Sequence, residues 1–190
     1  MAVGNLMRAN LAREKLRHPA HRVLYPDRCI LTFMPIAYLL CGSTGAGKTT
    51  HGKSLALSQQ AQLFSIDEWM QNLFWQDAPP NSDIAWASER VRRCERQIWL
   101  IAERLLQAKI SIVLDLGFSK REQREHFRKL VTSAGATPKL LYLDIPASVR
   151  WERVKARNLS KEGTYQFDVS EETFRWMESY FEAPGDDELL

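Results

Sequence analysis

The sequence lacks the usual marks of secreted, membrane and metal-binding proteins. Its three cysteines, Cys29, Cys41 and Cys94, are odd in number and show neither paired-disulfide nor metal-ligand spacing, which indicates a reducing compartment. Its four histidines are scattered and form no metal triad. No apolar run reaches the roughly 18 residues of a membrane span, and no secretory signal is recognisable. We therefore expect a cytoplasmic protein that has no membrane partner.

The sequence also lacks a strong excess of either charge. The formal net charge is +3; residues 1–33 hold 6 basic and 2 acidic residues, which leaves 20 basic and 21 acidic residues in the rest. A near-neutral body offers no electrostatic footprint for extended nucleic acid, although a short oligonucleotide end stays open as a ligand. We expect one globular domain over residues 34–190, preceded by a basic extension, residues 1–33, that the chemistry does not need.

Four apolar runs predict the strands of an α/β fold. The first, Ile36–Cys41, is continuous, as in strands that are buried on both faces of a parallel sheet. The others cover residues 62–66, 110–114 and 139–143, and helix-compatible segments follow at 86–109, 120–134, 147–157 and 170–181. This alternation of strands and helices predicts a parallel sheet with covering helices.

A phosphate-binding motif directly follows the first strand. Residues 42–49 read G-S-T-G-A-G-K-T, which matches G-x-x-x-x-G-K-[ST] between a strand and a helix. In such a loop, backbone N–H groups point at the phosphates, Lys48 reaches the β- and γ-phosphates, and Thr49 ligates Mg²⁺. The predicted ATP-binding residues of this loop are Gly42, Ser43, Thr44, Gly45, Ala46, Gly47, Lys48, Thr49 and Thr50.

Two aspartates at the ends of predicted strands are candidate catalytic residues. The guanine reader N-K-x-D is missing, and the chain has no room for the added domains of mechanical ATPases, so a compact phosphotransferase is favoured. Asp67, in S-I-D, is placed to accept the proton of a substrate hydroxyl, or alternatively to cap the next helix. Asp115 closes V-L-D like a Walker B carboxylate that holds Mg²⁺.

Five arginines complete the predicted site. Arg153 and Arg157 lie four residues apart on one helical face and lead into a polar segment, so we expect them to bind the phosphates from a lid near residues 153–168. Arg90, Arg121 and Arg124 are candidate substrate-binding residues, with a solvated surface role as the alternative.

Several of these segments, taken together, resemble one known family. They are G-S-T-G-A-G-K-T-T, S-I-D, V-L-D-L-G-F with Arg121 and Arg124, L-D-I-P, R-V-K-A-R-N and the tail F-E-A-P with Glu188. Over residues 35–188 the chain resembles the predicted P-loop kinase family that is related to polynucleotide kinase, zeta toxin and chloramphenicol phosphotransferase.

The resemblance implies a three-layer P-loop NTPase fold with a parallel sheet of order 2-3-1-4-5. It also implies a base at Asp67, magnesium near Thr49 and Asp115, and lid arginines at Arg153 and Arg157. The chain reaches Leu190 where a fifth strand is expected, so we expect that strand to be missing or to be replaced by residues 29–33.

The expected function is therefore that of a small kinase. It would use ATP and Mg²⁺ to phosphorylate a hydroxyl of a small molecule, as a monomer or a homodimer. Two alternatives stay open: a polynucleotide 5′-hydroxyl kinase, and a nucleotide-binding regulatory or toxin-type module with little turnover.

Overall fold

The computed structural model describes residues 33–80, 82–161 and 168–189. Apart from Phe33, the expected extension 1–33 lies outside these residues, and so do residues 162–167 of the expected lid. The described elements are β1 (Ile36–Cys41), α2 (Lys48–Ser58), β2 (Gln62–Ser65), α3 (Ile66–Leu73), η1 (Trp75–Asp77), α4 (Ile84–Gln107), β3 (Ile112–Asp115), α5 (Arg121–Ser133), β4 (Thr137–Tyr142), α6 (Ala147–Ser160), α7 (Glu171–Tyr180) and η2 (Asp186–Glu188).

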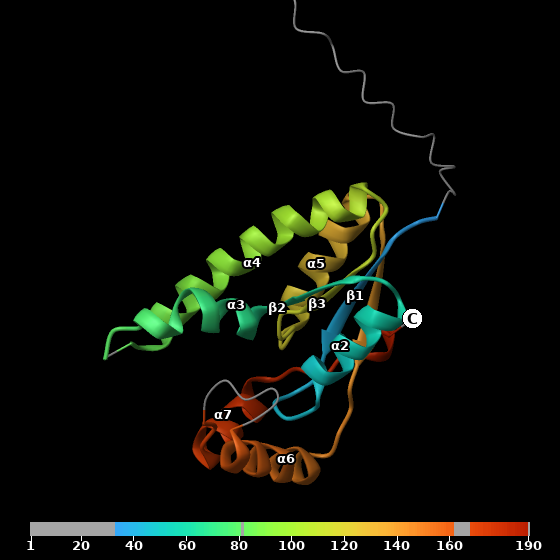
Figure 1. The fold of residues 1–190 in the computed structure, drawn as a ribbon. Coiled ribbons are helices and arrows are strands. Elements are labelled where there is room, and N and C mark those ends of the chain that lie inside the picture. The colour runs from blue at the N-terminus through green and yellow to red at the C-terminus, as the bar shows by residue number, and fades with distance from the viewer. Residues whose placement is uncertain (1–32, 81, 162–167, 190) are drawn as a thin grey trace, which may run out of the picture. The chain divides into compact units, whose positions relative to one another are not determined.

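Four parallel strands form the sheet, in the order β2-β3-β1-β4 (Figure 1). Tyr38 of β1 pairs with Val113 of β3 on one side and with Lys139 of β4 on the other. The α/β fold and the expected order 2-3-1-4 are thereby confirmed. No fifth strand occurs in the described part of the chain, and the described C-terminal segment forms the short 3-10 turn η2 instead.

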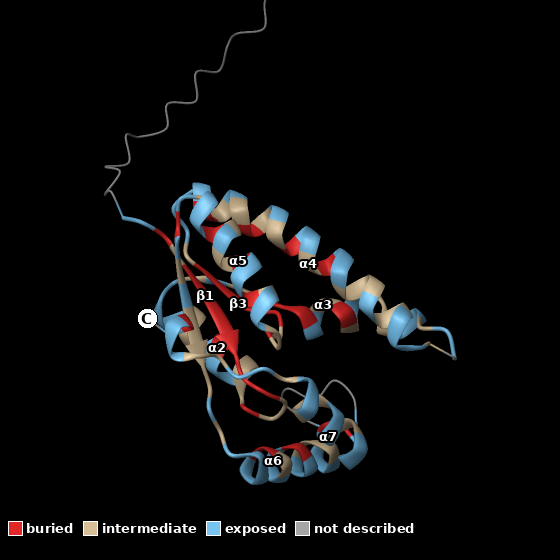
Figure 2. Ribbon diagram, turned by 180° about the vertical axis from the view of Figure 1, so that it is seen from behind, coloured by how far each residue is buried: buried red, intermediate tan, exposed pale blue. Residues whose placement is uncertain are grey.

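Each face of the sheet has its own apolar core, because successive side chains of a strand point to opposite faces. Tyr38, Leu40 and Val113 face one side, where Leu55 and Ala56 of α2 pack against them. The opposite face carries the larger core, built with α3, α4 and α5 (Figure 2). Its buried members include Ala37, Leu39, Ile112, Leu114, Ile98, Leu106, Phe127 and Val131. The result is the expected three-layer arrangement.

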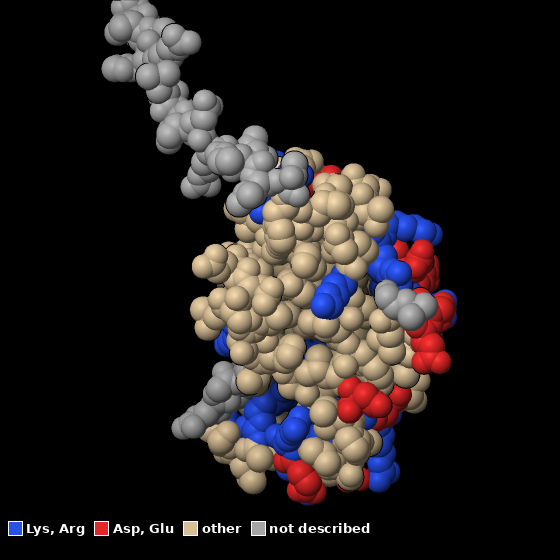
Figure 3. Space-filling view, turned by 90° about the vertical axis from the view of Figure 1, so that its right-hand side faces the viewer, with Lys and Arg blue, Asp and Glu red and all other residues tan. Residues whose placement is uncertain are grey.

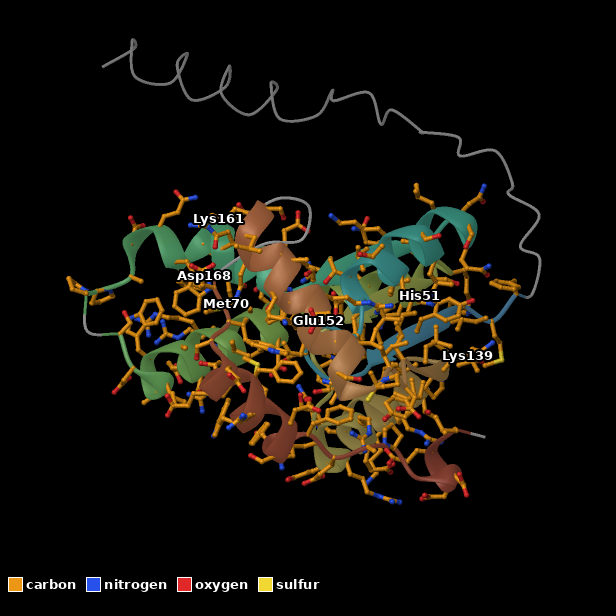
Figure 4. All side chains as sticks on the ribbon, turned by 90° about the horizontal axis from the view of Figure 1, so that it is seen from below. His51, Met70, Lys139, Glu152, Lys161 and Asp168 are labelled. Carbon is orange, nitrogen blue, oxygen red and sulfur yellow. The ribbon has the colours of Figure 1, made fainter. Side chains whose placement is uncertain are left out.

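Helices α6 and α7 lie beyond the carboxyl ends of the strands (Figure 1). They share a small apolar cluster of their own, in which Val154 and Phe174 are buried and Trp151 packs against them. Figure 4 shows α6 crossing this end of the domain, with Glu152 on its outer surface and Lys161 at its C-terminal end. Because parallel strands all end at one edge, the loops after β1 and β3 and the start of α3 meet beneath these two helices.

Helix signals in the sequence explain where two of the helices begin. The side chain of Asp83 accepts a hydrogen bond from the backbone N–H of Trp86, at 2.8 Å, and starts α4. Ser170 accepts one from the N–H of Thr173, at 3.1 Å, and starts α7. No helix in the described ranges has the length and apolar content that crossing a membrane requires.

Candidate active site

The loop between β1 and α2 turns tightly against α6. Gly45 has φ +81°, and a Cβ at this position would lie 2.6 Å from the backbone oxygen of Arg150, so only glycine fits here. Gly47, at φ +91°, is the N-cap of α2 and directs the free N–H groups of this 11-residue helix toward the loop. This backbone has the tight turn and the free N–H groups that the predicted phosphate cradle requires.

Lys48 points back into this loop. Its Nζ donates to the backbone oxygens of Gly42, at 2.8 Å, and Ser43, at 3.3 Å. Burial lowers the pKa of Lys48, while the nearby Asp115 and Asp67 oppose that effect. The ammonium group is thus held among two carboxylates and the loop, at the place where an anion can bind.

Asp115 ends β3 directly beside the cradle and is only 5% exposed. It accepts a hydrogen bond of 2.8 Å from the hydroxyl of Thr49. Burial raises the pKa of Asp115 above its ordinary value, and Lys48 and the Thr49 hydrogen bond limit that rise. A hydroxyl and a carboxylate in contact match the hard oxygen donors that Mg²⁺ prefers.

The residues present fit a magnesium ion that arrives with a nucleotide. The described ranges contain no cluster of three or more His, Cys, Asp or Glu side chains that could hold a metal by itself. Mg²⁺ at such sites is bound by one or two protein oxygens and takes its remaining ligands from phosphates and water. The hydroxyl of Thr49 and the carboxylate of Asp115 would supply the oxygen ligands that come from the protein.

Asp67 lies in the first turn of α3, and its position excludes the helix-cap alternative. The N-cap of α3 is Ser65, two residues earlier. Burial raises the pKa of Asp67, while the charges of Lys48 and then Arg157 lower it. The carboxyl group thus faces the cradle rather than serving the end of its own helix.

Arg153 and Arg157 reach the same place from α6. Arg153 donates to the backbone oxygen of Ala46 at 3.4 Å. The Nε of Arg157 is buried and, in the described part of the structure, has no hydrogen-bond partner. A buried donor without a partner is rare in native proteins, so this N–H is free to donate to an acceptor that enters the site.

One cavity of about 640 Å³ joins these groups. Figure 3 shows Lys and Arg side chains gathered around a hollow at the end of the domain that carries α6 and α7. The described wall of the cavity consists of the cradle, the start of α3, the end of β3 with the loop after it, one face each of α6 and α7, and residues next to these helices. Its members are Gly42, Ser43, Thr44, Gly45, Gly47, Lys48, Thr49, Thr50, Ile66, Asp67, Asp115, Gly117, Ser119, Arg153, Val154, Arg157, Ser160, Val169, Trp176, Met177, Tyr180 and Phe181.

Comparison with known families identifies the chain. A family model described as "AAA domain" matches residues 38–184. The chain belongs to this AAA domain family. Among curated proteins, none matches it.

Solved structures share the fold of this AAA domain at low identity. A Chloroflexus aurantiacus protein, provisionally assigned as a kinase, matches with a TM-score of 0.63 and 22% identity, covering 80% of this chain and 83% of its own. A sugar kinase from Janibacter sp. matches with a TM-score of 0.55 and 20% identity, covering 80% and 81%. Kti12 from Chaetomium thermophilum, in complex with ADP-AlF3, matches with a TM-score of 0.56 and 15% identity, covering 78% and 81%. These likenesses show a common fold.

None of the three expected substrate-binding arginines, Arg90, Arg121 and Arg124, lines the cavity of the AAA domain. Arg124 is 0% exposed, and its guanidinium is taken up by Glu188 and by the backbone oxygens of Phe118 and Glu182, so it cannot touch a substrate in this structure. Arg121 pairs with Asp187 at the surface.

Arg90 is the third of these arginines and lies on α4. Its guanidinium stands over the ring of Trp86, 4.0 Å from the ring centroid. The nearness of Arg121 and Arg124 to Asp115 in sequence was misleading, because α5 leads away from the strand ends.

Arg150 and Glu178, which the sequence analysis did not assign to the site, hold the cradle against α7. The hydroxyl of Ser43 donates a hydrogen bond to the carboxylate of Glu178. Arg150 forms an ion pair with the same carboxylate and donates to the backbone oxygen of Thr44 at 3.1 Å. Hydrogen bonds from Arg150 keep the pKa of Glu178 below its ordinary value. No local pattern announces this contact, because it joins positions 135 residues apart.

Proposed function

We propose that this AAA domain is an ATP-dependent phosphotransferase that moves the γ-phosphoryl group of ATP to a hydroxyl of a small molecule. The observation that carries the proposal is the single cavity that gathers Lys48, Thr49, Asp67, Asp115 and Arg157. Cation, carboxylate and backbone donors converge there, and phosphoryl transfer depends mainly on such positioning and charge stabilisation. The names of the structural neighbours, a sugar kinase and a gluconokinase among them, support it.

In the proposed reaction the acceptor oxygen bonds to the γ-phosphorus while the bond from that phosphorus to the bridging oxygen of ADP breaks. The hydroxyl proton passes to the carboxylate of Asp67, a role that typically accelerates transfer by roughly 10²–10⁴-fold. Lys48, Arg153 and Arg157 stabilise the charge on the transferring group. Magnesium, held with the nucleotide by Thr49 and Asp115, would neutralise charge on the β- and γ-phosphates.

Asp67 suits the part of proton acceptor because its surroundings act on its pKa in opposite directions. Burial raises the pKa, which makes the carboxylate a better base than an exposed aspartate, while Lys48 and Arg157 restrain the rise.

Within the described residues Cys41 and Cys94 are buried free thiols, which supports a reducing compartment such as the cytoplasm.

The experiment that tests the proposal is a phosphotransfer screen. The protein is incubated with γ-labelled ATP, Mg²⁺ and pooled sugars, nucleosides, phenicol-like and aminoglycoside-like compounds and short oligonucleotides. A labelled product that disappears with Lys48→Ala establishes the phosphotransferase and its substrate class. Bound ATP with no labelled product would contradict it and favour a regulatory nucleotide-binding module, and a labelled oligonucleotide alone would favour the polynucleotide kinase.

A further inference from the structure

Two aromatic side chains of α7 form an open stack on the wall of the cavity. Trp176 and Tyr180 are one helical turn apart, with ring centroids separated by 5.4 Å and ring planes inclined by 16°. Both line the cavity, yet Trp176 is 50% and Tyr180 47% exposed. Packing of α7 does not require them, because its buried anchor is Phe174, which packs with Val154 and Trp151 of α6.

The helix that carries this stack contacts the cradle close to Lys48. The Nζ of Lys48, the atom that reaches the β- and γ-phosphates in such loops, rests on the backbone oxygens of Gly42 and Ser43. Glu178 of α7 contacts the hydroxyl of Ser43, and the hydroxyl of Thr44 lies 2.9 Å from the sulfur of Met177. Helix α7 therefore touches the cradle beside Lys48, where the γ-phosphoryl group is expected, and we infer that the acceptor approaches along this helix.

Within the stack, Trp176 offers the larger free surface. The Nζ of Lys120 lies 4.2 Å from the centroid of the Tyr180 ring, and Trp176 stacks on the same ring. Tyr180 is thus engaged by two neighbours, while Trp176, which also lines the cavity, keeps half of its surface exposed. A flat, open indole recognises the face of another planar ring.

The uncharged polar side chains that line the described part of the cavity are the short hydroxyls of Ser and Thr, together with that of Tyr180. Among the described residues that line the cavity there is no Asn, Gln or Glu, and the two carboxylates, Asp67 and Asp115, already face Lys48. Glu178 is occupied by Arg150 and Ser43. A sugar recognised through several hydroxyls needs a set of such polar partners, whereas a planar ring needs mainly a stacking surface.

We propose that the acceptor carries a planar aromatic ring, which stacks on Trp176 with support from Tyr180 while its hydroxyl faces the cradle. The proposal rests on the phosphotransferase function. It names the chemical class of the substrate: a hydroxyl compound built on an aromatic or heteroaromatic ring, such as a nucleoside or a phenyl alcohol.

Matched acceptors test this class. Uridine is compared with ribose, and 1-phenylethane-1,2-diol with propane-1,2-diol, so that each pair presents the same kind of hydroxyl with and without a ring. Transfer from γ-labelled ATP is measured on each. We expect the ring-bearing member of at least one pair to be used about tenfold more efficiently, as one stacked base contributes. Equal use within both pairs overturns the proposal.

Variants separate the stack from the nucleotide site. We expect Trp176→Ala to raise the KM of the ring-bearing acceptor about tenfold and leave the KM of ATP unchanged, with Trp176→Phe close to wild type. Leu57→Ala on α2, 82% exposed and outside the cavity wall, is the matched control. A rise in the KM of ATP with Trp176→Ala overturns the proposal, because the indole would then hold the adenine.

A binding measurement keeps the inference distinct from the proposed function. If no acceptor is phosphorylated, calorimetric titration of uridine and of 1-phenylethane-1,2-diol is carried out with the site saturated by ADP. Binding of a ring compound that Trp176→Ala abolishes supports the stacking site even though the transfer proposal fails. Absence of binding by both ring compounds overturns the stacking site.

Discussion

Arg124 and Glu188 form a buried two-point ion pair although 64 residues separate them. The Nε and Nη2 of Arg124 donate to the two carboxylate oxygens of Glu188 at 2.7 and 2.9 Å, and neither side chain is more than 5% exposed. The third nitrogen, Nη1, donates to the backbone oxygens of Phe118 and Glu182. The segment after α7 is thus fastened to the loop after β3, which lines the cavity through Gly117 and Ser119.

Removal of Glu188 should destabilise the domain. Glu188→Ala leaves the guanidinium of Arg124 buried without its counter-charge, and breaking such a pair costs about 3–5 kcal/mol. The free energy of unfolding, measured by urea denaturation at neutral pH, should fall by that amount. The matched control is Asp187→Ala, since Asp187 is 62% exposed and its pair with Arg121 should contribute about 0–1 kcal/mol.

The same pair predicts the pH dependence of stability. Hydrogen bonds from Arg124 hold the pKa of Glu188 below its ordinary value of 4.5. A carboxyl group with a depressed folded-state pKa stabilises the fold above its unfolded pKa, and this contribution is lost as the pH falls through the folded pKa. The stability difference between wild type and Glu188→Ala should therefore shrink below about pH 4.5. A constant difference down to pH 2 would contradict the account.

The pH profile of transfer should respond to Arg157. Burial already raises the pKa of Asp67 above its ordinary 3.8, and the charge of Arg157 limits the rise. The proposed base must be ionised, so kcat/KM falls as the pH decreases through that pKa. Arg157→Met should raise the pKa further and shift the acid limb to higher pH. Arg153→Met removes an equal charge from the same helix. Because Arg153 contacts the backbone oxygen of Ala46, this variant should leave the acid limb of the pH profile unchanged.

The magnesium requirement should depend on Asp115. Asp115→Asn keeps the hydrogen bond from Thr49 and removes the negative charge, so the Mg²⁺ concentration for half-maximal activity should rise about 10-fold or more. Thr49→Ser keeps the hydroxyl and serves as the control. An unchanged Mg²⁺ titration with Asp115→Asn would show that this carboxylate does not serve the metal.

Gly45 should tolerate no side chain. Gly45→Ala places a Cβ 2.6 Å from the backbone oxygen of Arg150, at φ +81°, so α6 must move away from the cradle. Gly117→Ala has a similar backbone, φ +90°, with nothing within 4 Å of the added carbon. Gly117→Ala should cost only the conformational strain of about 1–3 kcal/mol, and Gly45→Ala should cost more and also weaken ATP binding. Equal losses of stability and of affinity in both variants would contradict the close packing of α6.

Much of the fold was predictable from sequence because its signals are local. The continuous run Ile36–Cys41 followed by the glycine-rich loop predicts the central strand, and the structure has the same bounds. The third strand begins at Ile112 rather than at residue 110, because the N–H of Ile110 still bonds to Leu105 of α4 at 2.9 Å and Lys109 adopts φ +63°. Such turns after a helix are decided by backbone conformation that an apolar run does not reveal.

The parts of the site that sequence did not predict depend on contacts between distant segments. Arg124 follows Asp115 closely in the chain, which suggested a substrate contact, but its partner Glu188 decides where its guanidinium lies. Likewise, nothing near Trp176 or Glu178 indicates that α7 returns to the cradle. The docking of α7 on the loop after β1 is a tertiary event, and only the structure shows it.

The role of Asp67 is decided by comparing phosphotransfer and ATP binding in wild type and Asp67→Asn, with Mg²⁺ and the acceptor found by screening. The transfer rate should fall by roughly 10²–10⁴-fold, because the base is removed, while the affinity for ATP stays near that of wild type. Transfer at the wild-type rate in Asp67→Asn would contradict the assignment of the base and, with it, the proposed reaction.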